Sequence, residues 1–275
     1  MVEIENLVFS YKKHSPLFTD FSLEVQHGSI VGLLGKNGAG KTTLLNILGG
    51  LLPPQSGTVR VNGFSPAERK PAFLADVRVI SEEFSLPHIK IRQFVSANAP
   101  LYPSFDLQKL QTILSEFELN ENASLAKLSH GQRKKFLIAF ALASNCKLLL
   151  LDEPTNGLDI PSKTQFRKIL VSSVSDEQIV LISTHQVKDI NTIIDKIVVI
   201  DNGKTIFAQE MEKIGSTFRF ETVADLKSAK DVIYSEKAFD GYHIILPNSS
   251  GTETGVDLEL FFNYLINKDL SNNNL

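Results

Sequence analysis

A glycine-rich loop lies between a short apolar run and a helical segment of this sequence, an order that few folds share. The run SIVGLLG covers residues 29–35, the loop GKNGAGKTT covers residues 35–43, and the helical pattern ends near Pro53 and Pro54. In such a layout the glycines let main-chain N–H groups converge, and the N-terminus of the helix attracts anions. Because the strand and the helix are read independently of the loop, their order predicts a phosphate-binding site and is poorly explained by an ordinary glycine turn.

Apolar strands alternate with helical segments over most of the chain. The runs LLLLD, IVLIS and KIVVID, at residues 148–152, 179–183 and 196–201, have the length of strands, and helical patterns precede and follow the first of them. This alternation predicts an α/β fold with a largely parallel sheet covered by helices on both faces. Residues 2–9 and 20–25 instead mix apolar and polar residues at the short period of strands, which predicts a small N-terminal antiparallel β region.

Two regions depart from the alternation. A helical insertion is expected at about residues 86–130. Within it, the positions spaced for one apolar helix face are Leu107, Leu110, Ile113, Leu114 and Phe117. From residue 217 the pattern restarts with a strand, a polar helix, a second strand and an amphipathic helix at residues 257–268. We therefore expect one domain over residues 1–215 and a small α+β appendage over residues 216–275, with a frayed end.

Composition and charge narrow the classes of function. With 275 residues, 43% of them hydrophobic, the chain can bury a substantial core, and a formal net charge of -3 gives no reason to expect a nucleic-acid partner. The first residues are acidic where a secretory signal is basic, and Cys146 is the single cysteine, so we expect an unexported protein. The longest apolar stretch, residues 136–151, is interrupted by Ser144, Asn145 and Lys147 and falls short of the roughly 20 apolar residues of a membrane helix.

Two carboxylates follow the strand LLLLD. Open α/β sheets bind ligands at the carboxyl ends of their strands. An acidic pair before a proline is, taken alone, more often a solvated strand end. Beside the loop at Gly35 it instead favours phosphoryl transfer, in which Asp152 holds Mg²⁺ and Glu153 orients the attacking water. In the loop itself, Lys41 is expected to reach the β- and γ-phosphates and Thr42 to bind the metal.

The segment LSHGQ, residues 128–132, opens the helix after the insertion and resembles the LSGGQ signature of ABC ATPases. In that family two subunits meet head to tail, and the signature of one covers the γ-phosphate bound to the other. The resemblance therefore implies that Ser129 and Gly131 act across a dimer interface. His130 stands where the family usually has glycine. Read alone, Ser129 would be only a helix N-cap.

Further family features follow in order, and the resemblance covers about residues 2–206. Residues 156–159, NGLD, resemble the D-loop, and residues 183–185, STH, end in a histidine placed like the switch histidine that contacts the γ-phosphate. Tyr11 is similar to the aromatic residue that stacks on adenine. Glu82 stands where the Q-loop glutamine is common, with Glu83 as the neighbouring candidate.

The resemblance implies three sets of site residues. The catalytic set is Glu153, His185 and Lys41. The Mg²⁺ set is Thr42, Asp152 and Glu82. The ATP-binding set is Tyr11, Gly35, Lys36, Asn37, Gly38, Ala39, Gly40, Lys41, Thr42, Thr43, Ser129, Gly131 and Gln132.

The resemblance also implies a fold and a role. The fold is that of an ABC-type P-loop NTPase. The expected role is a Mg²⁺-dependent ATPase subunit that drives transport through a separate transmembrane permease, as a head-to-tail dimer with itself or a homologous subunit. Such a subunit is cytoplasmic and held at the membrane by its partner. Residues 101–106, LYPSFD, are similar to exporter-type systems, which favours export.

Two other roles stay open. The first is a soluble ABC ATPase of translation or DNA repair. The chain shows no sustained heptads and a single phosphate loop, and neither feature favours that role. The second is a regulatory subunit that does not hydrolyse ATP, suggested by Glu82 and His130.

Overall fold

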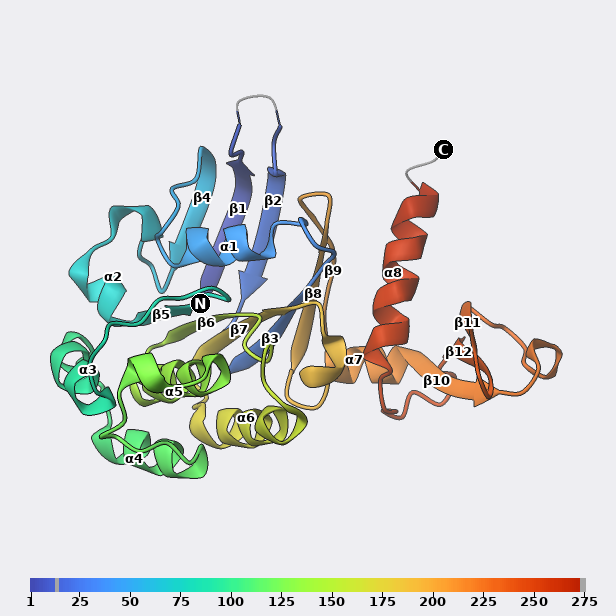
Figure 1. Ribbon diagram of the computed structural model, residues 1–275. Coiled ribbons are helices and arrows are strands. Elements are labelled where there is room, and N and C mark those ends of the chain that lie inside the picture. The colour runs from blue at the N-terminus through green and yellow to red at the C-terminus, as the bar shows by residue number, and fades with distance from the viewer. Residues whose placement is uncertain (13–14, 273–275) are drawn as a thin grey trace.

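The computed structural model describes residues 1–12 and 15–272, so the end of the expected frayed tail, residues 273–275, lies outside the described residues. Within that description, no helix combines the length and apolar character needed to cross a membrane. Figure 1 shows a main body of stacked sheets and helices and, to one side, a segment that begins at α7 (Met211–Thr217) and ends with α8 (Leu258–Asn272).

A six-stranded sheet forms the centre of the main body. In spatial order its strands are β5 (Val77–Ile80), β6 (Leu148–Asp152), β7 (Ile179–Thr184), β3 (Ser29–Leu34), β8 (Lys196–Asp201) and β9 (Lys204–Glu210). The first five are parallel, and β9 pairs antiparallel with β8. The predicted α/β fold with a largely parallel sheet is confirmed, whereas neither edge strand, β5 or β9, was predicted.

Both faces of this sheet are buried, which explains why its strands read as continuous apolar runs. Side chains alternate across a strand, so Leu148 and Leu150 of β6 join one hydrophobic cluster while Leu149 and Leu151 join the other. The first cluster is closed by α1 (Lys41–Leu48) and by the N-terminal antiparallel sheet. That sheet has the order β2 (Phe18–Val25), β1 (Val2–Phe9), β4 (Ser56–Val61). The antiparallel pairing of β1 with β2 is as expected, whereas the pairing of β1 with β4 was not predicted.

Helices cover the opposite face of the central sheet (Figure 1). They are α3 (Ile91–Asn98), α4 (Leu107–Glu116), α5 (His130–Ala143) and α6 (Ile160–Ser173), while the short α2 (Pro71–Ala75) leads into β5. Of the apolar positions expected on this helix face, three in α4 and its C-cap Phe117 are buried, but Leu107 is 57% exposed. It is the first residue of the helix, directly after the N-cap Asp106, and lies outside the buried stripe.

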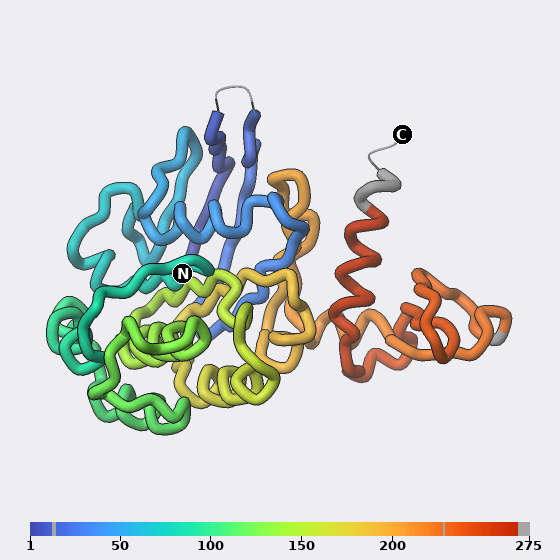
Figure 2. The backbone as a smooth tube through the Cα atoms, viewed as in Figure 1, coloured from blue at the N-terminus to red at the C-terminus, as the bar shows by residue number. Residues whose placement is uncertain are grey.

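The C-terminal segment contains a second, three-stranded antiparallel sheet. Its order is β10 (Phe218–Val223), β12 (Gly241–Pro247), β11 (Tyr234–Ala238). The polar helix expected after β10 is only a 3-10 turn at Leu226–Ser228, and β11 was not predicted. Figure 2 shows α8 returning beside the main body. The fully buried Phe261 of α8 packs on Phe207 of β9, so this segment and the central sheet share one hydrophobic core.

Candidate functional site

The glycine loop joins β3 to α1 with a backbone that side chains would obstruct. Gly38 and Gly40 have φ values of +82° and +105°, in the left-handed region that favours glycine. A Cβ on Gly40 would stand 2.7 Å from Phe18 Cζ, and one on Gly35 would stand 2.5 Å from the carbonyl oxygen of Ile200. The loop therefore lies close against its neighbours, and its far side, at Gly38, faces open space.

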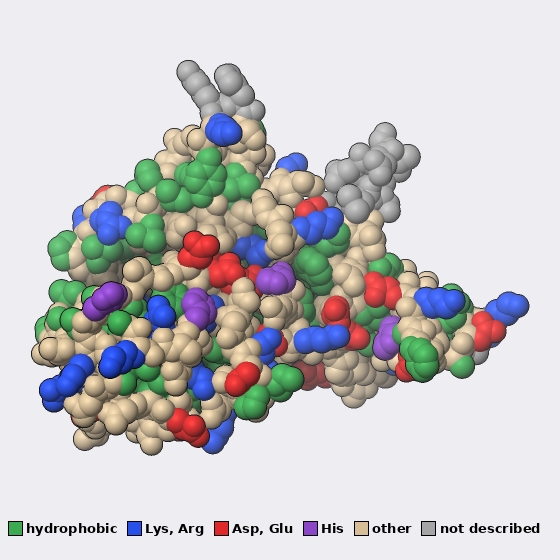
Figure 3. Space-filling model, in the orientation of Figure 1, with side chains coloured by type: hydrophobic (Ala, Val, Ile, Leu, Met, Phe, Trp, Pro, Cys, Tyr) green, Lys and Arg blue, Asp and Glu red, His purple; other side chains and the backbone are tan. Residues whose placement is uncertain are grey.

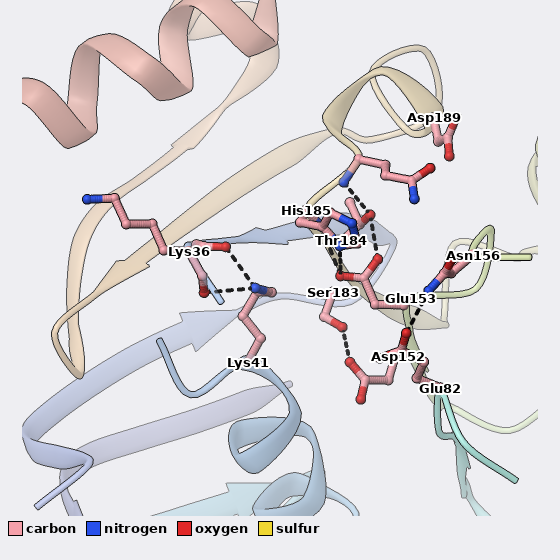
Figure 4. Close-up of polar contacts among 12 residues, drawn as sticks. Lys36, Lys41, Glu82, Asp152, Glu153, Asn156, Ser183, Thr184, His185 and Asp189 are labelled. Atoms are coloured by element: carbon pink, nitrogen blue, oxygen red, sulfur yellow. Dashed lines mark hydrogen bonds and ion pairs between the residues drawn. The ribbon is translucent and has the colours of Figure 1, made fainter. Parts of the chain in front are cut away.

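Lys41, the first residue of α1, is held by the loop itself. Its ammonium donates to the carbonyl oxygen of Gly35 at 2.7 Å and to that of Lys36 at 3.1 Å (Figure 4). Burial lowers the pKa of Lys41, and the negative charges of Glu153, Asp152 and Glu82 oppose that shift. A cation thus faces carboxylates across the site, in a position where a phosphate would compete for it.

The ends of β6 and β7 bring the acidic pair and the histidine together. Because these strands are parallel neighbours, with Asp152 in register with Ser183, the residues after them meet at one edge. The hydroxyl of Ser183 donates to Asp152, and that of Thr184 donates to Glu153 Oε2 at 3.0 Å. The ring Nδ1 of His185 donates to Glu153 Oε1 at 2.8 Å, and its main-chain N–H donates to the same oxygen at 2.9 Å. Figure 4 shows this group.

The carboxylate of Glu82 reaches the site from the segment after β5. Its Oε1 accepts a hydrogen bond of 2.6 Å from Nδ2 of Asn156, in the loop that follows the acidic pair. Glu83 is exposed and does not line the cleft. Of the two carboxylates considered from the sequence, the structure brings Glu82 to the other site residues.

These groups surround one cleft of about 510 Å³. Acidic and histidine side chains gather near the middle of the face shown in Figure 3. The residues that line the cleft are Tyr11, Leu17, Asn37, Gly38, Gly40, Lys41, Thr42, Thr43, Glu82, Asp152, Glu153 and His185. All but Leu17 follow from the sequence motifs or their neighbours. Leu17 was missed because its place beside Gly40 depends on the fold of the N-terminal sheet.

Tyr11 lies at the rim of the cleft. Its side chain is 65% exposed, its hydroxyl is 2.9 Å from Oγ1 of Thr43, and its ring packs edge-on against Phe9 with centroids 5.0 Å apart. Because the Tyr11 ring is held through its edge and its hydroxyl, one of its faces stays available to stack on another ring.

Six of the residues expected to bind ATP do not line the cleft. Gly35, Lys36 and Ala39 belong to the loop behind it, where the carbonyl oxygens of Gly35 and Lys36 hold Lys41. Ser129, Gly131 and Gln132 lie apart from it, at the start of α5.

The signature segment forms an exposed helix N-terminus. Ser129 and Gln132 make a reciprocal capping box, with the Gln132 N–H donating to Ser129 Oγ at 3.2 Å and the Ser129 N–H donating to Gln132 Oε1 at 3.0 Å. A Cβ on Gly131 would stand 3.3 Å from the carbonyl oxygen of Gly157. His130 stacks on Phe84, with centroids 5.1 Å apart. The N-terminus of this helix is thus free to meet a ligand outside the chain's own cleft.

The metal-binding residues expected here offer hard oxygen donors: the hydroxyl of Thr42 and the carboxylates of Asp152 and Glu82. Among the described residues, no group of three or more His, Cys, Asp or Glu side chains could hold a metal by itself. A hydroxyl with one or two carboxylates suits Mg²⁺, which keeps several waters and commonly takes phosphate oxygens as further ligands.

Comparison with known proteins agrees with this geometry. The ABC transporter ATP-binding protein NatA of Bacillus subtilis is 28% identical over 217 residues, which cover 76% of this chain and 88% of that protein. The energy-coupling factor transporter ATP-binding protein EcfA2 of Caldanaerobacter subterraneus subsp. tengcongensis is 31% identical over 241 residues, covering 78% and 84%.

A solved structure shows the same fold. The ATP-binding cassette MJ0796, in a dimeric post-hydrolysis state bound to ADP and Pi, superimposes with a TM-score of 0.67 at 23% identity, covering 76% of this chain and 98% of that one. The sequence model of the family described as ABC transporter matches residues 18–156, which span the glycine loop, the signature and the acidic pair. The chain therefore belongs to the ABC transporter family, as one of its ATP-binding ATPase chains.

Proposed function

We propose that this chain is the motor of a transporter, in which ATP bound and hydrolysed in the cleft drives a membrane-spanning polypeptide separate from it. One observation carries the proposal. The glycine loop, the acidic pair and His185 surround one cleft, while the signature helix presents its N-terminus elsewhere. In a dimer, the cleft of one copy would bind the phosphates, and the helix N-terminus of the other copy would contact them. Such an arrangement allows a cycle in which the dimer closes and opens.

The residues of the cleft divide the chemistry between them. The loop N–H groups and Lys41 bind the phosphates, and Tyr11 stacks on the adenine. Glu153, oriented by Thr184 and His185, aligns the attacking water and accepts its proton. Thr42, Asp152 and Glu82 would hold Mg²⁺, which supplies positive charge for the phosphate oxygens when bound.

We also propose that the chain acts as a dimer. Ser129 and Gln132 are exposed, and the helix N-terminus that they cap would contact the γ-phosphate held by a second, head-to-tail subunit. The structure of MJ0796, which has the same fold and is a dimer bound to ADP and Pi, supports the formation of a dimer.

We further propose that the chain has a separate membrane-spanning partner. The relatives include an energy-coupling factor transporter protein, and we infer for this chain a permease that holds it at the cytoplasmic face of the membrane. We infer export from the similarity of residues 101–106 to exporter-type subunits. Tyr102 fixes that segment to the core through a 2.7 Å hydrogen bond from Arg78 Nη1 to its hydroxyl and an edge-on contact with Phe140.

We also propose that residues 1–215 form the ATPase unit, with the helical insertion at about residues 86–130, and that residues 216–275 form an appendage docked on its sheet. The boundary falls inside α7, and the shared core around Phe261 supports a firm attachment.

The partner can be tested with a Glu153→Gln variant, which should keep ATP without turning it over. Tagged protein is expressed in its native cells, the membranes are solubilised in detergent with ATP and Mg²⁺, and co-purifying proteins are identified by mass spectrometry. Glu177→Gln, an exposed carboxylate at the opposite end of β7, is the control. A stoichiometric multi-spanning protein is expected. Recovery from the soluble fraction alone, or with ribosomes or DNA, would favour the soluble ATPase role instead.

A second test addresses the cleft itself. Glu153→Gln should accumulate as an ATP-bound dimer in size-exclusion chromatography, since water activation is lost while the phosphate contacts remain. Lys41→Ala should bind ATP more weakly because a phosphate contact is lost. A Glu153→Gln variant that turned over ATP normally would show that another group orients the water.

A further inference from the structure

A buried lysine of the signature helix has no part in the chemistry described above. Lys134 of α5 is 1% exposed. Its ammonium donates to two main-chain carbonyl oxygens, those of Glu153 and Asn156, each at 2.9 Å. Burying a cation is unfavourable unless it is hydrogen-bonded and its charge is offset. The buried ammonium of Lys134 therefore requires nearby groups that balance its positive charge.

The balancing charge is supplied by the carboxylates of the cleft. Asn156, which accepts from Lys134 through its carbonyl, donates through its side chain to Glu82 at 2.6 Å. Burial lowers the pKa of Lys134, and Glu82 leads the carboxylates whose charge raises it, followed by Glu153 and Asp152. Lys134 and Glu82 are thus linked through one residue and act on each other electrostatically.

The same ammonium fixes the turn that carries Glu153. This residue has a φ of +46°, a left-handed conformation that is strained for a residue other than glycine. Its N–H donates to the carbonyl oxygen of Ser183 at 3.0 Å, and its own carbonyl is held by Lys134. Both ends of the residue are therefore anchored, and its carboxylate is directed toward His185.

We propose that Lys134 is a positioning residue for ATP hydrolysis, which holds the Glu153 turn against the signature helix and offsets the charge of Glu82. This inference rests on the proposed role of Glu153. The proposal explains how position 82 can carry a carboxylate. The negative charge that Glu82 would add beside the γ-phosphate is balanced by the positive charge of Lys134. Lys134 also ties the water-orienting group to the helix that meets the second subunit.

Two substitutions separate the hydrogen bonds from the charge. Lys134→Gln keeps two N–H donors and loses the charge, whereas Lys134→Met loses both. We expect Lys134→Met to lower kcat by about 10-fold or more with the KM for ATP within about threefold, since an interaction that matters for the chemical step is removed. Lys134→Gln should lie between it and the unmodified chain. Lys135→Gln, the same change of charge one residue along α5, should leave both parameters near their original values.

A double variant tests the link to Glu82. If the two charges offset each other, Glu82→Gln should restore part of the kcat lost in Lys134→Gln, so the two effects should not add. Melting temperatures are measured for each variant, because a lysine that only stabilised the fold would change them and leave kcat of the folded protein unaltered. Unchanged kcat in Lys134→Met, or additive losses in the double variant, would overturn the inference.

Glu153→Gln is measured in the same assay, so that failure of the role inferred for Lys134 can be distinguished from failure of the role proposed for Glu153. Loss of hydrolysis in Glu153→Gln together with normal hydrolysis in Lys134→Met would reject Lys134 alone, whereas normal hydrolysis in Glu153→Gln would reject the role of Glu153 on which the inference depends.

Discussion

His185 and Glu153 are joined twice, since both the ring Nδ1 and the main-chain N–H of His185 donate to Oε1 of Glu153, at 2.8 and 2.9 Å. A carboxylate only accepts, so Nδ1 carries the proton and Nε2 is the ring nitrogen not engaged with Glu153. The side chain of Glu153 is 8% exposed and that of His185 is 46% exposed. The carboxylate is thus nearly buried, while the histidine ring bonded to it is partly exposed, and both line the cleft.

Removing this ring should impair hydrolysis more than binding. In His185→Ala the main-chain hydrogen bond can persist, but Glu153 loses the partner that orients it, so kcat should fall by about 10-fold or more while the affinity for ATP changes little. Steady-state hydrolysis and equilibrium nucleotide binding check this. His88→Ala, an exposed histidine outside the cleft, is the control. A His185→Ala variant with full kcat would contradict the assigned role.

The aromatic ring of Tyr11 should contribute to affinity without contributing to turnover. Stacking on a base is worth about 1 kcal/mol or more, so Tyr11→Ala should raise the Kd for ATP roughly fivefold. Tyr11→Phe keeps the ring and loses only the contact with Thr43 Oγ1, and should bind almost as well as the unmodified chain. Fluorescence titration with a labelled nucleotide measures both. An equal loss in the two variants would assign the effect to the hydroxyl.

Much of the cleft was predictable because its parts are fixed by local sequence or by one rule of topology. The glycine loop is contiguous with its strand and helix, and the acidic pair and His185 follow neighbouring parallel strands, whose carboxyl ends share an edge. The four inner strands of the central sheet and the pairing of β1 with β2 also followed from short-range patterns.

Contacts between distant segments were not predictable in the same way. Lysine is rarely buried, so Lys134 reads as a surface residue until α5 is packed against the loop after β6. The antiparallel strand β9 depends on a hairpin with β8, and the placement of Leu17 depends on the N-terminal sheet. Each of these features is decided by tertiary packing.

The carboxylate of Asp152 should govern the dependence on Mg²⁺. Asp152→Asn keeps the shape and the contact with Ser183 but loses the charge, so hydrolysis at a fixed Mg²⁺ concentration should fall by about 10-fold or more, and more Mg²⁺ should be needed for half-maximal rate. Asp176→Asn, an exposed change far from the cleft, is the matched control. Chelation by EDTA should abolish hydrolysis in the unmodified chain. An unaltered Mg²⁺ requirement in Asp152→Asn would remove Asp152 from the metal-binding set.

The single cysteine should be unreactive in the folded protein. Cys146 is 2% exposed, and burial raises the pKa of its thiol from 9.0 to about 11. Since the folded state holds this proton more tightly than the unfolded state, the contribution of Cys146 to stability is full below pH 9.0 and is lost as the pH rises toward about 11. Iodoacetamide at pH 8 should modify the chain in urea and spare the native chain, as read by mass spectrometry. Equal rates of alkylation would contradict the burial.

An aromatic cluster is among the contacts that join the C-terminal segment to the central sheet. Phe261 of α8 contacts Phe207 of β9 and Phe218 of β10, with ring centroids 5.2 Å apart in both pairs. Phe261→Ala should lower the free energy of unfolding by about 3–5 kcal/mol, because it leaves a cavity between the segment and the central sheet. Urea unfolding followed by circular dichroism measures the change. Phe239→Ala is the control, since that ring is fully exposed and its loss should change stability by no more than about 0.5 kcal/mol.

The shape of the Phe261→Ala unfolding transition reports how tightly the C-terminal segment is coupled to the rest of the protein. Because Phe261 lies in the same hydrophobic cluster as Ile190 and Ile193, which follow His185 in the chain, the whole protein should unfold in one transition displaced to lower urea. A new early transition that involves the C-terminal segment alone, with the main body unfolding as before, would instead show that the appendage contributes little to the fold of the cleft. In that case ATP binding should survive at urea concentrations where the segment has already unfolded.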